Sequence, residues 1–316
     1  MVQLRHLRYF VSVVNSRSFS RAATTIHVAQ PALSRQILEL EEIIGIELLH
    51  RTPRGVRTTV AGEVLYREAS AILSQMDRLP DLVRSAGGDI EGTVVVGMSS
   101  TLAASLAGPI VQASNARYPK IKLRLITGDS ILLKSRMDTT KLDLAIVFED
   151  VPSPGYNRQP LFRQRLYLIQ RESDADSSGV VSWERLAELP LILPALPNVT
   201  RILLDRAFAE AGIAPNKAGE ADVLSSMLSV VASGMAHTIL PKGDFSNVPG
   251  YESLMACPIE PAIFLTASII NSTDAPLSRP ARLVHRLLTD FVFNLITGAP
   301  PPGAQWIGGD PPLQAK

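Results

Sequence analysis

Apolar side chains recur at helical spacing in successive segments of the first sixty residues. The first stripe steps by three and four residues and consists of Leu4, Leu7, Val11 and Val14. This spacing predicts an amphipathic helix that ends within residues 15–17. A second, shorter helix is expected over residues 18–27, with Ser18 as its N-cap.

A third helix is predicted to begin near Pro31. The backbone N–H groups of the first helical turn have no partner within the helix, so proline, which lacks an N–H, loses no hydrogen bond there. Its buried stripe comprises Leu33, Ile37, Leu40 and Ile44, and Gly45 is expected to end it. The side chains that then point away from the core at its start are Gln30, Pro31, Ser34 and Arg35. Such an end is typical of the recognition helix of a helix-turn-helix, where Gln and Arg can read adenine and guanine edges. For this segment taken alone, a solvated polar face on a three-helix core is the favoured interpretation.

Residues 47–59 read ELLHRTPRGVRTT, with alternating character and a Pro-Arg-Gly turn. The pattern predicts a β-hairpin, a wing, that offers Arg51 and Arg54 to phosphates or to a minor groove. An exposed basic loop by itself carries no such meaning. Beside a helix-turn-helix it favours DNA as the partner.

A long helix is predicted from residue 60, with Thr59 as its N-cap. Its apolar positions follow a 3.5-residue repeat through Leu65, Ala69, Ile72, Met76, Leu79 and Val83. This repeat favours a coiled-coil seam between two copies of the chain; the alternative is a helix packed on its own domain. Pro80 is expected to kink or end the helix in its last turns, and residues 85–88 are expected to form a hinge.

From residue 91 the pattern changes to strands that alternate with helices, which favours a parallel sheet covered on both faces. Three strands of a first lobe are expected within residues 92–100, 121–130 and 142–150, with helices at about 102–118 and 131–140. Strands of a second, similar lobe are expected at 166–170, 191–193 and 238–240, and residues 262–269 return to the first lobe.

Ligands of such sheets bind beyond the carboxyl ends of the strands, between the lobes. Small polar residues at strand ends and helix starts would suit an anion such as a carboxylate there. The residues expected to line this cleft are Ser99, Ser100, Thr101, Thr127, Gly128, Phe148, Asn198, Thr200, Arg201 and His237. Each could singly be an ordinary cap, and a lone histidine is more often structural, but their convergence on one cleft favours a ligand site.

The distribution of charge supports an anionic partner for one end of the chain. Residues 1–60 contain eight Arg, no Lys and four Glu, which gives +4, so the remainder carries −3 of the net +1. The single Cys257 excludes an intramolecular disulfide and any CxxC motif. Without a signal peptide or a span of about 20 apolar residues, the protein is expected to be cytoplasmic.

No motif for a catalytic nucleophile, a metal or a nucleotide is present, so neither an enzyme nor a cofactor is expected. The Pro/Gly-rich residues 297–316 are expected to be a disordered tail.

The motifs SFSRAA, QPALSRQI and LEEIIGIELLHR, with Thr59, Ala61 and Gly62 after them, closely resemble the N-terminal domain of LysR-type transcriptional regulators. VASGMAHTILP stands where the family's effector domain has a VAxGxGxxxLP stretch, from which Ala236 and His237 depart. The wing and hinge look most like regulators of the nitrogen-assimilation-control kind.

The resemblance implies a multidomain chain: a winged helix-turn-helix domain (1–59), a dimerisation helix and hinge (60–88) and a two-lobed, periplasmic-binding-protein-like effector domain (89–296). Lobe I would take about 91–161 and 266–296, and lobe II about 162–265. The DNA-contacting residues it implies are Ser20, Arg21, Gln30, Pro31, Ser34, Arg35, Arg51 and Arg54.

The resemblance also implies the partners. They are promoter DNA, a small-molecule effector that alters DNA bending, further copies of the chain in a homodimer and homotetramer, and RNA polymerase as a further candidate. Two other classes remain open: a two-lobed solute-binding protein, which lacks a reason for the basic module, and an enzyme with a fused module, which lacks a catalytic set.

Overall fold

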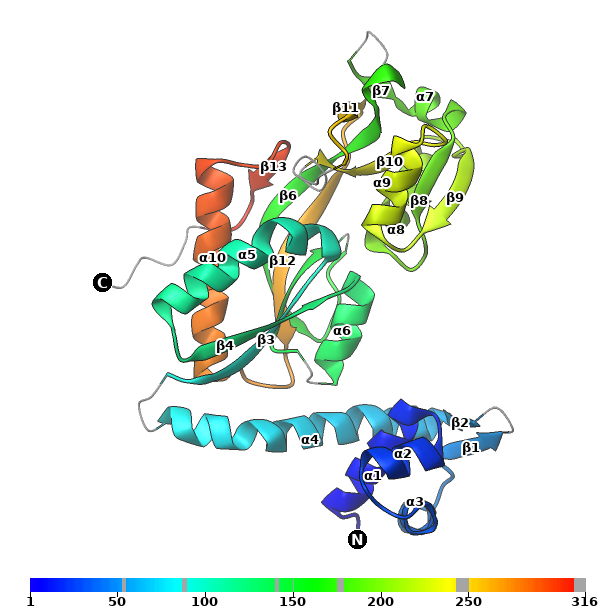
Figure 1. Cartoon of the computed structure of the whole chain (residues 1–316), viewed down its shortest axis with the longest axis vertical. Helices are drawn as coiled ribbons and strands as arrows, with labels where there is room; N and C mark the ends of the chain where they lie inside the picture. The colour runs from blue at the N-terminus through cyan, green and yellow to red at the C-terminus, as the bar shows by residue number, and fades with distance from the viewer. Residues whose placement is uncertain are drawn as a thin grey trace. The chain divides into compact units, whose positions relative to one another are not determined.

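The computed structural model describes residues 1–52, 55–86, 90–139, 142–149, 151–174, 179–242 and 250–309. The chain divides near Gly87 into two compact units, each with its own hydrophobic core (Figure 1). No helix in the described ranges is long and apolar enough to cross a membrane.

The N-terminal unit contains the three predicted helices, the hairpin and the long helix. Its elements are α1 (Leu4–Ser16), α2 (Phe19–Thr25), α3 (Gln30–Ile44), β1 (Leu49–Thr52), β2 (Gly55–Thr58) and α4 (Val60–Ala86). Phe10, Leu33 and Ile37 are fully buried where α1 and α3 meet the core. The predicted Ser18 cap is confirmed, since its Oγ accepts a hydrogen bond from the Arg21 N–H at 3.4 Å. Gly45 ends α3 in the left-handed conformation at φ 80°.

The hairpin is fixed to the helices by backbone contacts. β1 and β2 pair antiparallel from Leu49 opposite Thr58 to Thr52 opposite Gly55, which confirms the predicted wing strands. The Glu41 carboxylate on α3 accepts hydrogen bonds from the N–H groups of Leu48 and Leu49, at 2.8 and 3.1 Å. Gly55 has φ 122°, and a Cβ there would lie 2.6 Å from the Arg17 carbonyl oxygen, so only glycine fits.

Helix α4 begins as predicted, because the Thr59 Oγ1 accepts a hydrogen bond from the Gly62 N–H at 3.0 Å. A Cβ at Gly62 would lie 2.0 Å from the Leu48 carbonyl oxygen, so glycine permits the helix to approach the wing. Pro80 is expected to kink or end the helix; the helix continues through Pro80 to Ala86, so Pro80 does not end it. Two of the four expected hinge residues, Ser85 and Ala86, are therefore helical, and 87–88 lie outside the described residues.

Lobe I of the C-terminal unit is a sheet with helices on both faces. Its elements are β3 (Gly92–Met98), α5 (Ser100–Arg117), β4 (Ile121–Thr127), α6 (Ser130–Asp138), β5 (Leu144–Glu149), β12 (Phe264–Ser272) and α10 (Arg279–Gly298). β3 pairs parallel with β4 and β5, as predicted. β12, which lies between β5 and β6, pairs antiparallel with both, so the expectation of a parallel sheet is wrong for this strand. The reason is that β12 enters from lobe II and runs in the opposite direction.

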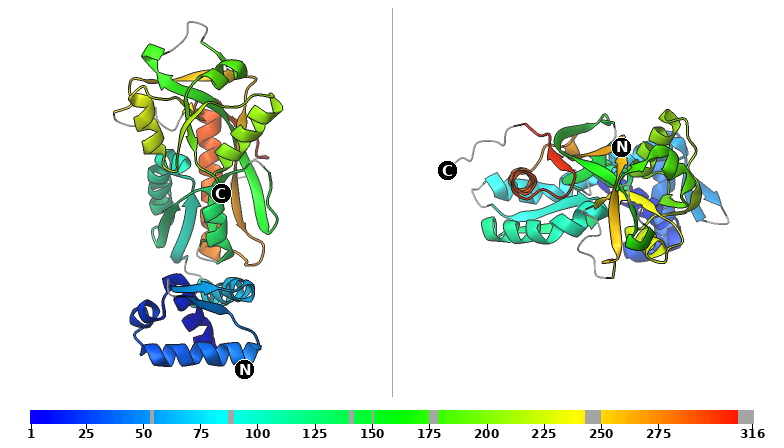
Figure 2. Two further views of the ribbon diagram at one scale, coloured as in Figure 1. Left: turned by 90° about the vertical axis from the view of Figure 1, so that its right-hand side faces the viewer. Right: turned by 90° about the horizontal axis from the view of Figure 1, so that it is seen from above.

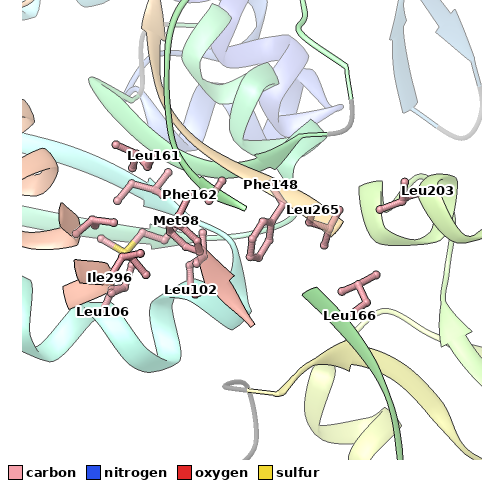
Figure 3. Close-up of a cluster of buried hydrophobic side chains, with 14 of the residues drawn as sticks. Met98, Leu102, Leu106, Phe148, Leu161, Phe162, Leu166, Leu203, Leu265 and Ile296 are labelled. Carbon is pink, nitrogen blue, oxygen red and sulfur yellow. The ribbon is translucent and has the colours of Figure 1, made fainter. Parts of the chain in front are cut away.

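Alternating side chains of each strand supply two separate cores. Met98, Ile146 and Phe148 belong to the core that α5 and α10 cover, whereas Ala145 and Val147 pack with Leu133 and Met137 of α6 and with nearby residues. The two views of Figures 1 and 2 agree that α5 and α10 lie side by side. Figure 3 shows Leu102 and Leu106 of α5 beside Met98 and Ile296 in this core. The double cover predicted from the sequence is therefore present.

Lobe II is joined to lobe I through β12 and the sixteen-residue strand β6 (Tyr156–Arg171). Its other elements are a 3-10 turn (Glu172–Asp174), β7 (Val181–Ser182), α7 (Trp183–Glu188), β8 (Leu191–Pro194), α8 (Val199–Glu210), β9 (Lys217–Ala221), α9 (Leu224–Ala232), β10 (Thr238–Pro241) and β11 (Leu254–Glu260). β6 pairs with β12 as far as Arg165 and with β10 from Leu166. The lobes thus change at Arg165 and Leu166, four residues after the boundary expected at 161 and 162.

The C-terminal residues correct a further expectation. α10 extends to Gly298, and β13 (Ala304–Trp306) pairs antiparallel with β6 at Phe162 to Gln164. The Trp306 ring packs edge-on against Phe293, with centroids 5.1 Å apart. The prediction of a disordered tail is therefore wrong for residues 297–309. Their Pro/Gly-rich composition is typical of disorder, but pairing with β6 and the contact between Trp306 and Phe293 order the segment. Residues 310–316 lie outside the described residues.

Truncation after Gly298 is expected to lower the free energy of unfolding by about 2–3 kcal/mol, from the lost strand hydrogen bonds and Trp306 contacts. Urea unfolding of the full chain and of the 1–298 variant measures the difference. A 1–309 variant serves as control and should match the full chain. Equal midpoints for all three chains would show that β13 contributes nothing to stability.

Candidate functional site

The start of α3 presents polar side chains on a buried scaffold. Gln30, Pro31 and Arg35 are exposed and Ser34 is half-buried, whereas Leu33 is fully buried. The Gln30 Nε2 donates a hydrogen bond to the Ser34 Oγ at 3.1 Å, which restricts the amide before any partner arrives. A restricted amide loses less rotamer freedom on binding, so this end is prepared for a polar contact.

Helix α2 places its predicted contact residues on the solvent side. Ser20 and Arg21 are exposed, while Phe19, Ala22 and Ala23 are buried against the neighbouring helices. The wing adds Arg57, which is exposed on β2. Of the predicted wing residues, Arg54 and the side chain of Arg51 lie outside the described residues.

The predicted seam of α4 separates into two parts. Leu65 is partly buried against the core of the N-terminal unit and Ala69 is fully buried, so both pack within their own unit. Ile72, Met76 and Leu79 are 43%, 42% and 56% exposed, and Val83 continues this stripe. The apolar stripe open to a partner is therefore the C-terminal half of the predicted one.

A cavity of about 80 Å³ lies between the two lobes of the C-terminal unit. It brings together seven of the ten residues expected to line the cleft: Ser99, Ser100, Thr101, Gly128, Phe148, Asn198 and Thr200. These residues come from strand ends and helix starts of both lobes, which is the position predicted from the sheet topology.

Four helix N-termini lie at this cavity, those of α5, α6, α8 and α9, and the first three have a side-chain cap. Ser99 Oγ accepts from the Leu102 N–H of α5 at 3.4 Å, and Asn198 Oδ1 accepts from the Thr200 N–H of α8 at 2.8 Å. At α6, Asp129 Oδ1 accepts from the Leu132 N–H at 2.8 Å. Each N-terminus contributes partial positive charge, so the cavity can stabilise an anionic group.

Arg201 does not line the cavity, contrary to the expectation. Its side chain is buried, and its guanidinium donates to Asp205 and Glu220, both at 2.8 Å, and to the Pro194 carbonyl oxygen at 3.0 Å. Burial opposes the charge, but these hydrogen bonds raise the pKa of Arg201 above its ordinary value. The charge is engaged in joining α8 to β8 and β9, and the motif Asn-Val-Thr-Arg alone could not reveal that.

Thr127 and His237 are also absent from the cavity lining. Thr127 is exposed at the last position of β4. His237 precedes β10, whereas Leu240 near the other end of that strand lines the cavity. Burial lowers the pKa of His237, so the imidazole is neutral at pH 7 and adds no positive charge to the lobe.

Sequence reasoning missed both acidic residues and several other residues of the lining. The residues it missed are Asp129, Ser130, Pro194, Asp222, Leu224, Met227 and Leu240. Asp129 could have been found, since it follows Gly128 directly at a strand end. Asp222 could not, because β9 reads KAGEA and lacks the apolar alternation that marks a strand.

Cys257 is buried in lobe II, where Gln170 Nε2 donates a hydrogen bond to its Sγ at 3.1 Å. Burial raises the pKa of the thiol, which therefore stays protonated at neutral pH. A reactive sensor cysteine needs an accessible thiolate, so this residue is suited to packing.

Comparisons with known proteins agree with this geometry. Residues 4–63 match the model described as bacterial regulatory helix-turn-helix protein, lysR family, and residues 87–292 match the LysR substrate binding domain. The nitrogen assimilation regulatory protein Nac of Escherichia coli K12 is 31% identical over 295 residues, covering 93% of this chain and 96% of Nac. The regulator BenM of Acinetobacter baylyi is 29% identical over 246 residues, 76% of this chain and 80% of BenM.

Solved structures share the fold over the whole length. A full-length OxyR variant of Pseudomonas aeruginosa has a TM-score of 0.69 at 23% identity, and the match covers 96% of this chain and 98% of the OxyR chain. Full-length CbnR in complex with its target DNA has a TM-score of 0.64 at 21% identity, with coverages of 92% and 100%. At these identities the similarity establishes the fold.

Proposed function

The chain belongs to the family of LysR-type transcriptional regulators, and we propose that it binds promoter DNA through α3 and responds to a small molecule in the cavity between its lobes. The observation that carries the proposal is the build of α3, in which the fully buried Leu33 and Ile37 hold the exposed Gln30 and Arg35 outward. These side chains have the bidentate geometry that base edges require. The DNA complex of CbnR, which shares this fold, supports DNA as the partner.

The cavity supports effector control. Four helix N-termini favour a carboxylate-type group, and residues of both lobes contribute, so a ligand would bind one relative position of the lobes better than another. A tenfold preference shifts the equilibrium between two such positions by about 1.4 kcal/mol. We further propose that this shift alters DNA bending in a homotetramer formed from dimers.

Two refinements belong to the same proposal. The similarity to Nac supports the placement of this chain in the subgroup of nitrogen-assimilation-control regulators. The relatives of this chain are named as regulators, which supports a DNA-binding role in the cytoplasm and a function without a catalytic step. RNA polymerase is the further partner expected at a promoter. Turnover of metabolites without any DNA binding would contradict this function.

Gln30→Ala is expected to relax the preference at one base pair of each half-site by about 1–3 kcal/mol, because it removes a base-edge contact. Arg54→Ala is expected to weaken binding to all sequences and to reduce the salt dependence of log K by about one unit, because it removes a phosphate contact. Fluorescence anisotropy with a footprinted promoter and its single-base variants, over a series of salt concentrations, separates the two effects.

Glu42→Gln is the control for Gln30→Ala, since Glu42 is exposed in the last turns of the same helix, away from its reading end. It should leave base preference unchanged. If Gln30→Ala and Arg54→Ala both bound the promoter as the unaltered protein does, the assignment of the DNA-reading surface would be wrong.

A further inference from the structure

We propose that the effector is a small neutral α-amino acid, whose carboxylate lies at the helix N-termini of the cavity and whose ammonium group lies at Asp222 and Asp129. The inference rests on the proposed function of the cavity as the effector site and adds the chemical class of the ligand.

The charges of the lining carry the inference. Among the described residues that line the cavity, two are carboxylates and none is Lys, Arg or His. A helix N-terminus is equivalent to about half a positive charge. Four such helix ends therefore about balance the two full negative charges, so the lining offers both signs of charge to a ligand. A ligand that carries only a carboxylate would leave the two aspartates unmatched, and a simple cation would leave the helix ends unmatched.

The two carboxylates are arranged for one shared positive group. Asp129 follows β4 in lobe I and Asp222 follows β9 in lobe II, so a ligand ammonium would contact both lobes. Asp129 uses Oδ1 to cap α6. Within the described part of the chain, the Asp222 side chain forms no hydrogen bond or ion pair, although Arg201 pairs with Glu220 two residues away. Asp222 is thus free to take a cation from the ligand.

The size and the walls of the cavity set the limits on the side chain. A volume of about 80 Å³ holds roughly six water-sized groups, which matches the non-hydrogen atoms of glycine, alanine or serine. Phe148, Met227 and Leu240 are buried and form an apolar wall, so a second charged group on the ligand would lack a partner there. A small neutral side chain fits this wall.

Calorimetry on the full-length protein tests the inference with matched pairs of ligands. Glycine, L-alanine and L-serine are compared with glycolate, L-lactate and L-glycerate, which carry a hydroxyl in place of the ammonium group, and with ethylamine. At least one amino acid is expected to bind tenfold or more tightly than its hydroxy acid and than ethylamine. Asp222→Asn should reduce that affinity at least tenfold, while hydroxy-acid binding is retained or improved.

Asp274→Asn is the matched control, because Asp274 is an exposed carboxylate of the same unit outside the cavity lining. It should keep the preference of the unaltered protein, and unfolding midpoints check that both variants are folded. Hydroxy acids that bind as tightly as their amino acids would overturn the inference while leaving the cavity an effector site. So would unchanged amino-acid binding in Asp222→Asn. The inference would also be overturned if none of the seven probes bound. Binding of promoter DNA is measured in parallel, and it would show whether the proposed regulator function still stands.

Discussion

Replacement of Met76 by aspartate on α4 is expected to convert the protein from an oligomer to a monomer and to lower its affinity for promoter DNA at least a hundredfold. Met76 is 42% exposed in the isolated chain and lies in one stripe with Ile72, Leu79 and Val83. A monomeric soluble protein rarely leaves such a stripe uncovered, and a 3.5-residue repeat is the spacing of a helix–helix seam. In the dimer, each copy would have to bury an aspartate at position 76 in the helix–helix seam without an opposite charge to pair with it.

Light scattering measures the mass, and Val60→Asp is the matched control. Val60 is the first residue of α4, is 87% exposed and lies outside the repeat, so the same charge there should leave the oligomer intact. An unchanged mass for Met76→Asp would contradict the seam, and the exposed stripe would then need another partner.

The second large effect is expected at Glu149, at the end of β5. Its side chain is 2% exposed and forms ion pairs with Lys134 of α6 at 2.9 Å and Arg158 of β6 at 2.6 Å. Glu149→Ala would leave two partly buried cations without their counter-charge, and we expect it to lower the free energy of unfolding by about 3 kcal/mol.

Glu260→Ala is the comparison, because Glu260 pairs with Arg165 at 2.6 Å but is 54% exposed. Solvent screens an exposed pair, so this variant should lose no more than about 1 kcal/mol. Urea unfolding at neutral pH measures both variants. Equal losses would show that burial does not distinguish the two ion pairs.

Local sequence signals predicted the N-terminal unit almost completely. Caps and breakers such as Ser18, Thr59 and Gly45 act through contacts within a few residues, so their effect on the backbone is visible in the sequence. The exception is Pro80, where α4 continues although the residue favours a break.

Long-range pairing explains what the sequence left undetermined in the C-terminal unit. The antiparallel direction of β12 and the order of the tail at β13 both depend on β6, a partner more than a hundred residues away. The cavity shows the same limit. Topology placed helix-start residues such as Ser100 and Thr200 at the cavity correctly. Asp222 could not be predicted, because it follows a strand without apolar alternation. Only tertiary contacts reveal that Arg201 forms an ion pair with Glu220 and does not line the cavity.

We propose that the first turn of α3 reads DNA sequence. The test is selection from a random DNA library, followed by sequencing, with the full-length unaltered protein and with the full-length Gln30→Ala variant. We expect the unaltered protein to enrich a sequence with two-fold symmetry, and Gln30→Ala to lose the preference at one position of each half-site while the other positions persist. Enrichment of no common sequence, or of the same sequence at every position by both proteins, would contradict the claim.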